Sequence, residues 1–126
     1  MINARSETAA NLPTWRGALQ TGRCLIGSGG FFEWEKSGRP KRKYLFSLPG
    51  ESYLFMDGLH RDFSEPGGVW PRRFAILTTE ANSSIASIHN RMPVVVRTLE
   101  FVRWFSEDFG AIFDRQDVVC QSQQMT

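Results

Sequence analysis

Short apolar segments alternate with tight-turn residues between positions 23 and 59, and this alternation constrains the fold more than any other feature. The apolar segments are separated by SGG, SGRPKRK and PGES. Glycine and proline at this spacing mark turns, and short apolar runs joined by turns are typical of hairpins in an antiparallel sheet. We therefore predict strands at 23–27, 31–36, 44–48 and 53–59.

The rest of the chain predicts a further strand and several short helices. A Pro- and Gly-rich loop at 61–71 precedes an apolar strand at 72–81. Residues 92–96 are predicted to be extended, 117–121 to form a last strand, and the tail after it to be frayed. The first thirteen residues are polar and lack a core pattern.

Helices are predicted after Pro13, at 82–90 and at 98–110. The first has Trp15, Ala18 and Leu19 on one face and ends at Gly22. The last is capped by Thr98, ends at Gly110, and places Leu99, Val102 and Phe105 on one apolar face. Together these elements predict an α+β domain around a mainly antiparallel sheet, curled into a partial barrel with short flanking helices.

Length and composition restrict the class of protein. At 126 residues the chain is expected to form a single domain spanning 1–126 and a monomer. No apolar stretch approaches the about 20 residues of a membrane span, and no export signal is visible, so a cytoplasmic location is expected. The two cysteines are far apart and form no metal-binding motif, so neither a metal nor another cofactor is expected. A net charge of +2 fits a polyanionic partner without requiring one.

Three polar residues are candidates for chemistry. Glu33 lies between Phe32 and Trp34, where loss of water would raise the pKa of its carboxyl, although strand alternation alone favours a solvent-facing side chain. His89 has a side chain suited to proton transfer, or it is a core histidine satisfied by a backbone carbonyl. Asn3, with Arg5 beside it, could orient a polar substrate and bind a phosphate, or it could serve as a capping or turn residue. No serine has the sequence context of a hydrolase nucleophile.

Four segments in order resemble one known family. NARSETA at 3–9, RCLIGSGGFFEW at 23–34, FAILTTEAN at 74–82 and IHNRMPVVV at 88–96 are similar to the motifs of the SOS response-associated peptidase (SRAP) family. The resemblance implies an abasic site processing protein whose partner is single-stranded DNA with abasic sites. It also implies autopeptidase activity and a covalent DNA–protein crosslink, made when an N-terminal cysteine condenses with the sugar aldehyde and closes a thiazolidine.

The resemblance also assigns roles to six residues of this chain. Asn3 would orient the crosslink, Glu33 would shuttle protons, and His89 would assist opening of the sugar ring. Arg5 and Arg91 would hold DNA phosphates, and Thr78 would contact the DNA backbone.

The chain departs from the family pattern at both ends. The resemblance places a cysteine and a further segment before NARSET, where this sequence has only Met1 and Ile2, and the family's C-terminal strand is not recognisable. Whether the chain is an enzyme is therefore left open, and as written it is predicted not to form the thiazolidine. Two alternatives remain: a non-covalent single-stranded DNA-binding module without catalysis, or a structural remnant with no activity.

Overall fold

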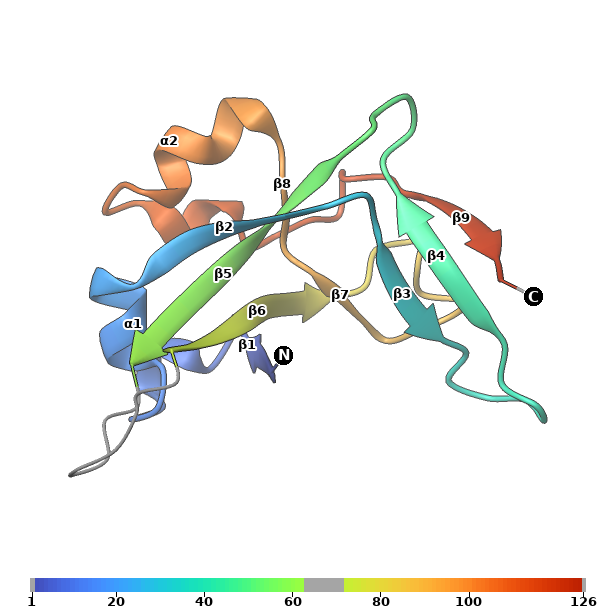
Figure 1. Ribbon diagram of the computed structural model, residues 1–126, viewed down its shortest axis with the longest axis horizontal. Helices are drawn as coiled ribbons and strands as arrows, with labels where there is room; N and C mark the ends of the chain where they lie inside the picture. The colour runs from blue at the N-terminus through green and yellow to red at the C-terminus, as the bar shows by residue number, and fades with distance from the viewer. Residues whose placement is uncertain (1, 63–71, 126) are drawn as a thin grey trace.

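The computed structural model describes residues 2–62 and 72–125, which form two sheets with short helices (Figure 1). The larger sheet has the strand order β1-β6-β5-β2, with β7 paired to β6 and β8 paired to β5. Its strands are β1 (Ile2–Arg5), β2 (Arg23–Ser28), β5 (Leu54–Asp62), β6 (Arg72–Glu80), β7 (Arg91–Pro93) and β8 (Val95–Val96). The smaller sheet has the order β3-β4-β9, with β3 (Phe31–Trp34), β4 (Lys43–Ser47) and β9 (Gln121–Gln124).

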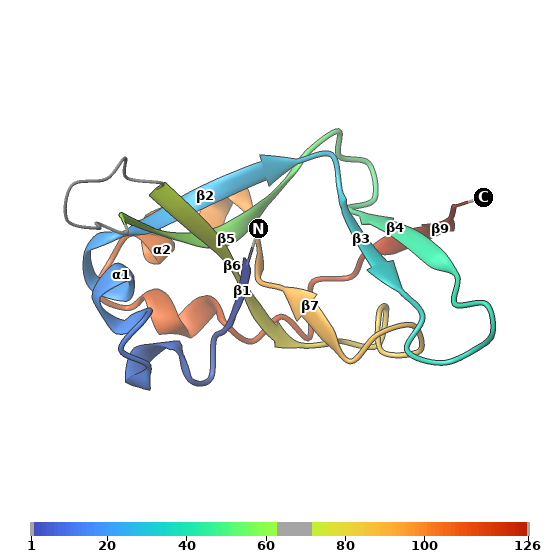
Figure 2. The ribbon, with the colours of Figure 1, turned by 60° about the horizontal axis from the view of Figure 1, so that its bottom comes forward.

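The predicted strands from 23 to 81 are confirmed, and their pairings with one another are antiparallel. The α+β prediction is also confirmed, with a sheet that curls without closing into a barrel among the described residues. Figure 2 shows the smaller sheet set to one side of the larger one. The predicted loop at 61–71 lies largely outside the described residues, apart from the end of β5.

The N-terminal segment differs from the expectation. Residues 2–5 form β1, which pairs in parallel with β6 from Ile2 opposite Ala75 to Arg5 opposite Thr78. Of the four residues of β1 only Ala4 is buried, and the apolar Ile2 is 44% exposed, so the segment shows no pattern of a buried strand. Backbone hydrogen bonding to β6 therefore decides this element, and a sequence pattern does not reveal such pairing.

The helices are shorter than predicted. Those outside the last segment are η1 (Ala9–Asn11) and α1 (Arg16–Thr21); α1 buries Ala18 and Leu19 and ends at Gly22 as expected. The predicted helix at 82–90 is wrong: residues 83–88 form turns, although two backbone bonds, from Ala86 to Asn82 and from His89 to Ile85, have helical spacing.

The predicted helix at 98–110 is also wrong in length and in its buried face. It is broken into η2 (Thr98–Glu100), α2 (Phe101–Trp104) and η3 (Phe109–Ile112). Leu99 is 95% exposed and Val102 83% exposed, whereas Trp104 is fully buried. Thr98 is not the cap; Arg97 precedes the helix and its backbone N–H donates to Glu100.

The C-terminal segment corrects a further expectation. The predicted strand at 117–121 is wrong, since residues before Gln121 are not in a strand. Instead β9 lies in the tail expected to be frayed and pairs with β4. All four of its side chains are exposed, so no apolar pattern marked it.

Two apolar clusters hold these elements together. One packs α1 and the last helices against the larger sheet around Leu19, Leu59, Leu77 and Trp104. The other lies where the sheets meet, around Phe46, Met56 and Ile85. Gly30 permits this junction, because a Cβ at that position would lie 2.4 Å from the carbonyl oxygen of Phe46. The second cluster therefore fixes the position of β3 relative to the larger sheet.

Asn82 anchors the segment that leads to β9. Its buried side-chain amide donates to the carbonyl oxygens of Arg115 at 2.8 Å and Val118 at 2.6 Å, and its Oδ1 accepts from Ser84. Asn82→Ala should lower the free energy of unfolding by about 2 kcal/mol, because buried carbonyls lose their donor. Urea unfolding would measure this, with the exposed Asn11→Ala as control. Equal midpoints for the two variants would contradict the anchoring role.

Candidate functional site

A cavity of about 400 Å³ lies between the two sheets and is open to solvent. Asn3 of β1, Glu33 of β3 and Thr78 of β6 all line it. The wall between them comes from the end of β2 and the turn into β3, where Gly27, Ser28 and Gly30 lie. Three of the six predicted site residues therefore meet in one cavity although they are up to 75 positions apart.

Glu33 points away from solvent more than strand alternation alone predicts. Its side chain is 24% exposed, and it shares a strand face with the buried Phe31. Phe32 and Trp34 alternate with it and are more than half exposed, so the pair does not enclose the carboxyl as the sequence suggested. Burial nevertheless raises the pKa of the Glu33 carboxyl, while His89 works in the opposite direction.

His89 faces Glu33 from the other side of the site. Its Nε2 lies 3.6 Å from Oε2 of Glu33, and its side chain is 35% exposed. The other ring nitrogen, Nδ1, lies 3.1 Å from the carbonyl oxygen of Arg91 and 3.2 Å from the Arg91 amide nitrogen. The backbone of Arg91 therefore orients the ring, and His89 is not a core histidine despite its contact with a carbonyl.

Arg91 is paired with an acid that sequence reasoning did not single out as its partner. Its Nη1 and Nη2 donate to the two carboxylate oxygens of Glu7 at 2.5 and 2.7 Å. Nη2 also donates to the carbonyl and hydroxyl oxygens of Thr78. The hydrogen bond from Arg91 lowers the pKa of Glu7 to about 2. The signal available in the sequence was an acidic residue within NARSET, close to Asn3 and Arg5.

The site residues thus form a connected set. Glu33 and His89 are an acid–imidazole pair, Asn3 supplies an amide, and Thr78 joins the cavity wall to Arg91. Arg5 is exposed at the end of β1 and is not among the described residues that line the cavity. A carboxyl with a raised pKa next to an imidazole can exchange protons with a bound substrate.

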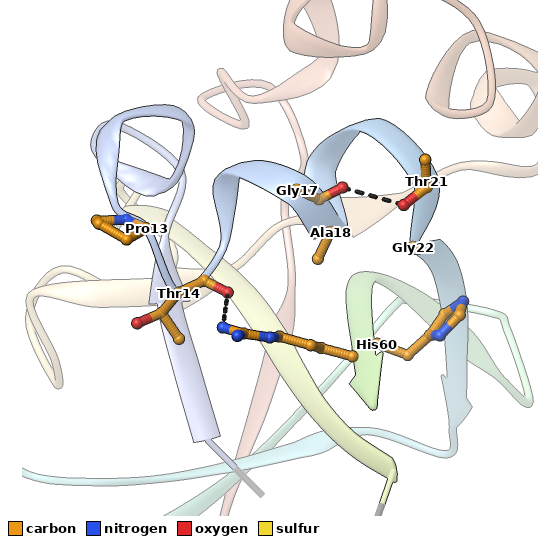
Figure 3. A pocket seen from close by; sticks show the side chains of 8 residues that line it. Pro13, Thr14, Gly17, Ala18, Thr21, Gly22 and His60 are labelled. Atoms are coloured by element: carbon orange, nitrogen blue, oxygen red, sulfur yellow. Dashed lines mark hydrogen bonds between the residues drawn. The ribbon is translucent and has the colours of Figure 1, made fainter. Parts of the chain in front are cut away.

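A second cavity, of about 360 Å³, lies at the other end of β5 against α1 (Figure 3). Pro13, Thr14, Gly17, Ala18, Thr21, Gly22, His60 and Arg61 line it. An Arg61 nitrogen donates to the Thr14 carbonyl oxygen at 2.9 Å. This cavity has no carboxyl among its lining residues, so it does not offer the acid–imidazole pair found between the sheets.

Within 2–62 and 72–125, no three His, Cys, Asp or Glu side chains gather as metal ligands would. In the same ranges, no helix is long and apolar enough to cross a membrane. Both cysteines are free thiols, and burial raises the pKa of each.

The fold and the site together define an α+β protein with an acid–imidazole pair in a cavity between two sheets. The chain belongs to the SRAP family: the family model described as "SOS response associated peptidase (SRAP)" matches residues 1–125. This agrees with the motif resemblance, whose segments supply Asn3, Glu33, Thr78 and His89.

Curated relatives carry one shared name. The chain is 32% identical over 108 residues to the abasic site processing protein YoqW of Bacillus subtilis, covering 84% of this chain and 48% of the relative. It is 30% identical over 110 residues to the abasic site processing protein YedK of Escherichia coli, covering 87% and 49%. The chain spans about half the length of these relatives.

Solved structures share the fold. A protein from Bacteroides thetaiotaomicron superposes with a TM-score of 0.88 at 25% identity, covering 98% of this chain and 58% of that one. A protein from Bordetella bronchiseptica superposes with a TM-score of 0.84 at 22% identity, covering 98% and 64%. The arrangement of sheets and helices is therefore that of known structures.

Proposed function

We propose that this chain recognises abasic sites in single-stranded DNA and carries the proton-transfer residues of an abasic site processing protein. The observation that carries the proposal is the meeting of Asn3, Glu33 and Thr78 in one cavity with His89 at 3.6 Å from Glu33. The relatives YoqW and YedK are named abasic site processing proteins, and these names supply the substrate class.

The chemistry proposed for Glu33 and His89 is opening of the abasic sugar. The ring form of this sugar is a hemiacetal, and opening it requires removal of the C1 hydroxyl proton and protonation of the ring oxygen. His89 accepts the hydroxyl proton at Nε2, and the Glu33 carboxyl donates a proton to the ring oxygen. The bond from C1 to the ring oxygen breaks, and the products are an aldehyde and a free hydroxyl. Asn3 orients the sugar by hydrogen bonding.

The covalent part of the proposed function depends on an amine and a thiol on one residue. An N-terminal cysteine provides both: its amine condenses with the aldehyde to an imine and releases water, and its thiol then adds to close the thiazolidine. Cys24 and Cys120 lie within the chain and have raised thiol pKa values, so neither takes this role. We propose that the crosslink and the autopeptidase activity require a cysteine-bearing segment beyond these residues.

The exposed face of β3 supports single-stranded DNA as the partner. Phe32 and Trp34 are more than half exposed on this face, and the Lys43 ammonium lies 4.2 Å from the Phe32 ring centroid. Exposed rings next to a cation are typical of surfaces on which unpaired bases stack. Because Phe32 also lines the cavity, a stacked strand would lead directly to it.

The same surface favours a second candidate, a non-covalent single-stranded DNA-binding module. It needs the aromatic face and the cations but not the acid–imidazole pair. The two candidates differ in one measurable respect: only the first distinguishes an abasic strand from an intact one.

Substitution of the acid–imidazole pair should remove this preference. We expect the protein to bind an abasic single strand at least about tenfold more tightly than the intact strand, as one charged hydrogen bond allows. Glu33→Gln and His89→Ala should bring the two affinities close together without lowering the thermal midpoint of unfolding. Fluorescence anisotropy with matched strands measures this, and the exposed Glu51→Gln is the control.

The pH dependence of sugar opening provides a second test of the proposed function. Since the pKa of Glu33 is raised, the protonated acid persists above its ordinary range, and sugar opening should slow as pH rises through that raised pKa. An aldehyde-reactive hydroxylamine would report the opened sugar. Equal binding of abasic and intact strands by the unsubstituted protein would overturn the proposal in favour of the second candidate. A heat-stable DNA adduct from this chain alone would overturn the need for a cysteine-bearing segment.

A further inference from the structure

Arg91, which the family resemblance predicts to hold a DNA phosphate, is already hydrogen-bonded within the protein. Both of its terminal nitrogens donate to Glu7 or Thr78, so a phosphate would have to displace a protein partner. Charge-assisted bidentate pairs of this kind are among the stronger hydrogen bonds in proteins. Other cations near the cavity are therefore better placed to meet the strand.

Such cations lie on the segment that joins β3 to β4. We call residues 36–43 the basic hairpin; it carries Lys36, Arg39, Lys41, Arg42 and Lys43 and no acidic residue. Both figures of the ribbon show it at the end of the molecule away from α1 (Figures 1 and 2). Gly38, with a φ of 110°, provides a backbone conformation that other residues rarely adopt, so the turn is tight.

Three of the five cations tie the basic hairpin to the site. Lys36 Nζ donates to Asn90 Oδ1 at 3.1 Å, next to His89 in the chain. Arg42 pairs with Glu35 at 2.9 Å, and Lys43 lies over the Phe32 ring. The hairpin is therefore continuous with the aromatic face of β3 and, through Phe32, with the cavity.

The other two cations are exposed. Among the described residues, neither Arg39 nor Lys41 has an acidic side chain within ion-pair distance. Unpaired exposed cations beside stacking rings are the arrangement with which proteins follow a single strand without reading its sequence. An ordinary solvated surface would instead intersperse acids among the cations.

We propose that the basic hairpin binds the phosphates of the strand that flanks the abasic nucleotide, with Arg39 and Lys41 as its principal contacts. The strand stacks its bases on Phe32 and Trp34 and passes its phosphates to the hairpin. This rests on the proposed function for the identity of the strand, and adds the surface that supplies most of the sequence-independent affinity.

Salt-dependent binding of an undamaged single strand tests the proposal. Arg39→Gln/Lys41→Gln should weaken binding of oligothymidylate about tenfold at low salt. It should also flatten the slope of log affinity against log salt by about 1.4, since each lost phosphate contact on a single strand contributes about 0.7. The matched control is Arg16→Gln/Arg103→Gln, which removes the same net charge from α1 and α2.

The outcomes separate this proposal from the proposed function. The hairpin variant should keep the ratio of abasic to intact affinity, whereas Glu33→Gln should lose that ratio and keep the salt slope. A wild-type slope in the hairpin variant, or an equal flattening in the control, overturns the hairpin surface. The unsubstituted protein could bind abasic and intact strands equally while the hairpin variant still flattens the salt slope. This result would overturn the proposed function and leave the hairpin as a single-strand binding surface.

Discussion

Asp57→Asn is expected to stabilise the protein, and the gain should grow by about 4 kcal/mol between pH 5 and pH 8. Asp57 lies in the middle of β5 with no exposed surface. Among the described residues, neither of its carboxylate oxygens has a hydrogen-bond partner. A charge in such a place loses its hydration without compensation, so the neutral acid is strongly favoured.

The groups that face Asp57 do not offset this burial. Desolvation raises the pKa of its carboxyl to about 8, with Arg115 opposing and Glu100 adding to the shift. The Arg115 guanidinium donates instead to Glu100 Oε1 at 2.7 Å and to the Val95 carbonyl oxygen at 3.2 Å. Cys24, on the neighbouring strand, is a further titratable group that interacts with Asp57.

The direction in which the free energy of unfolding changes with pH depends on how many protons the folded and unfolded states bind. Unfolded aspartate titrates near 3.9, so between about pH 4 and pH 8 the folded protein holds a proton that the unfolded chain has lost. Stability therefore falls as pH rises through this window, by about 1.4 kcal/mol per pH unit, and levels off above pH 8. Asparagine does not titrate, so the free energy of unfolding of the variant does not fall for this reason as pH rises. The raised pKa of Glu33 acts alike in both proteins and cancels in the difference.

Urea unfolding of the two proteins at pH 5, 6.5 and 8 would measure the effect. Glu107→Gln, an exposed carboxyl exchanged for an amide, provides the control and should run parallel to the unsubstituted protein. Parallel stability profiles for Asp57→Asn and the unsubstituted protein would show that Asp57 is already ionised in the fold.

Trp104→Ala should cost about 4 kcal/mol of unfolding free energy, the largest loss we expect from a single apolar truncation here. Trp104 is fully buried and contacts Phe109 edge-on, with ring centroids 5.9 Å apart. Its indole Nε1 donates to the Cys24 carbonyl oxygen at 2.8 Å, and its own carbonyl accepts from Arg23 Nε at 2.9 Å. Truncation removes the ring and leaves the Cys24 carbonyl without its donor.

Val102→Ala is the matched control in the same helix. Its side chain is on the face that the sequence pattern predicted to be buried, and it is exposed in the structure. Its truncation should change the urea midpoint by an amount equivalent to less than about 0.5 kcal/mol. A loss at Val102 as large as that at Trp104 would restore the buried face expected from the sequence and contradict the observed packing.

The contrast between these two residues shows where sequence patterning failed. Leu99, Val102 and Phe105 have helical spacing, but the segment is too short and broken to impose one continuous face. Trp104 is selected instead because it reaches Cys24 on β2 and Phe109 on η3. Periodicity reports only which residues of a helix share a face, and the neighbours decide which face is covered.

In the site, too, the sequence indicated the candidate residues, whereas the tertiary structure decided their contacts. Residue chemistry identified Glu33, His89 and Asn3 as candidates, because carboxyl, imidazole and amide groups stand out in apolar or extended segments. The 3.6 Å approach of His89 to Glu33 and the capture of Arg91 by Glu7 join residues 56 and 84 positions apart. Local sequence contains no information on such distances.

By itself the sequence determined where the strands of the two sheets begin and turn between residues 23 and 81, because period-two patterning and turn residues act over a few neighbouring positions. The tertiary structure alone decided the parallel pairing of β1, the capture of the polar strand β9 by β4, and the burial of Asp57 and Trp104. Backbone hydrogen bonds and desolvation depend on which distant segments come into contact, and only the folded chain specifies those contacts.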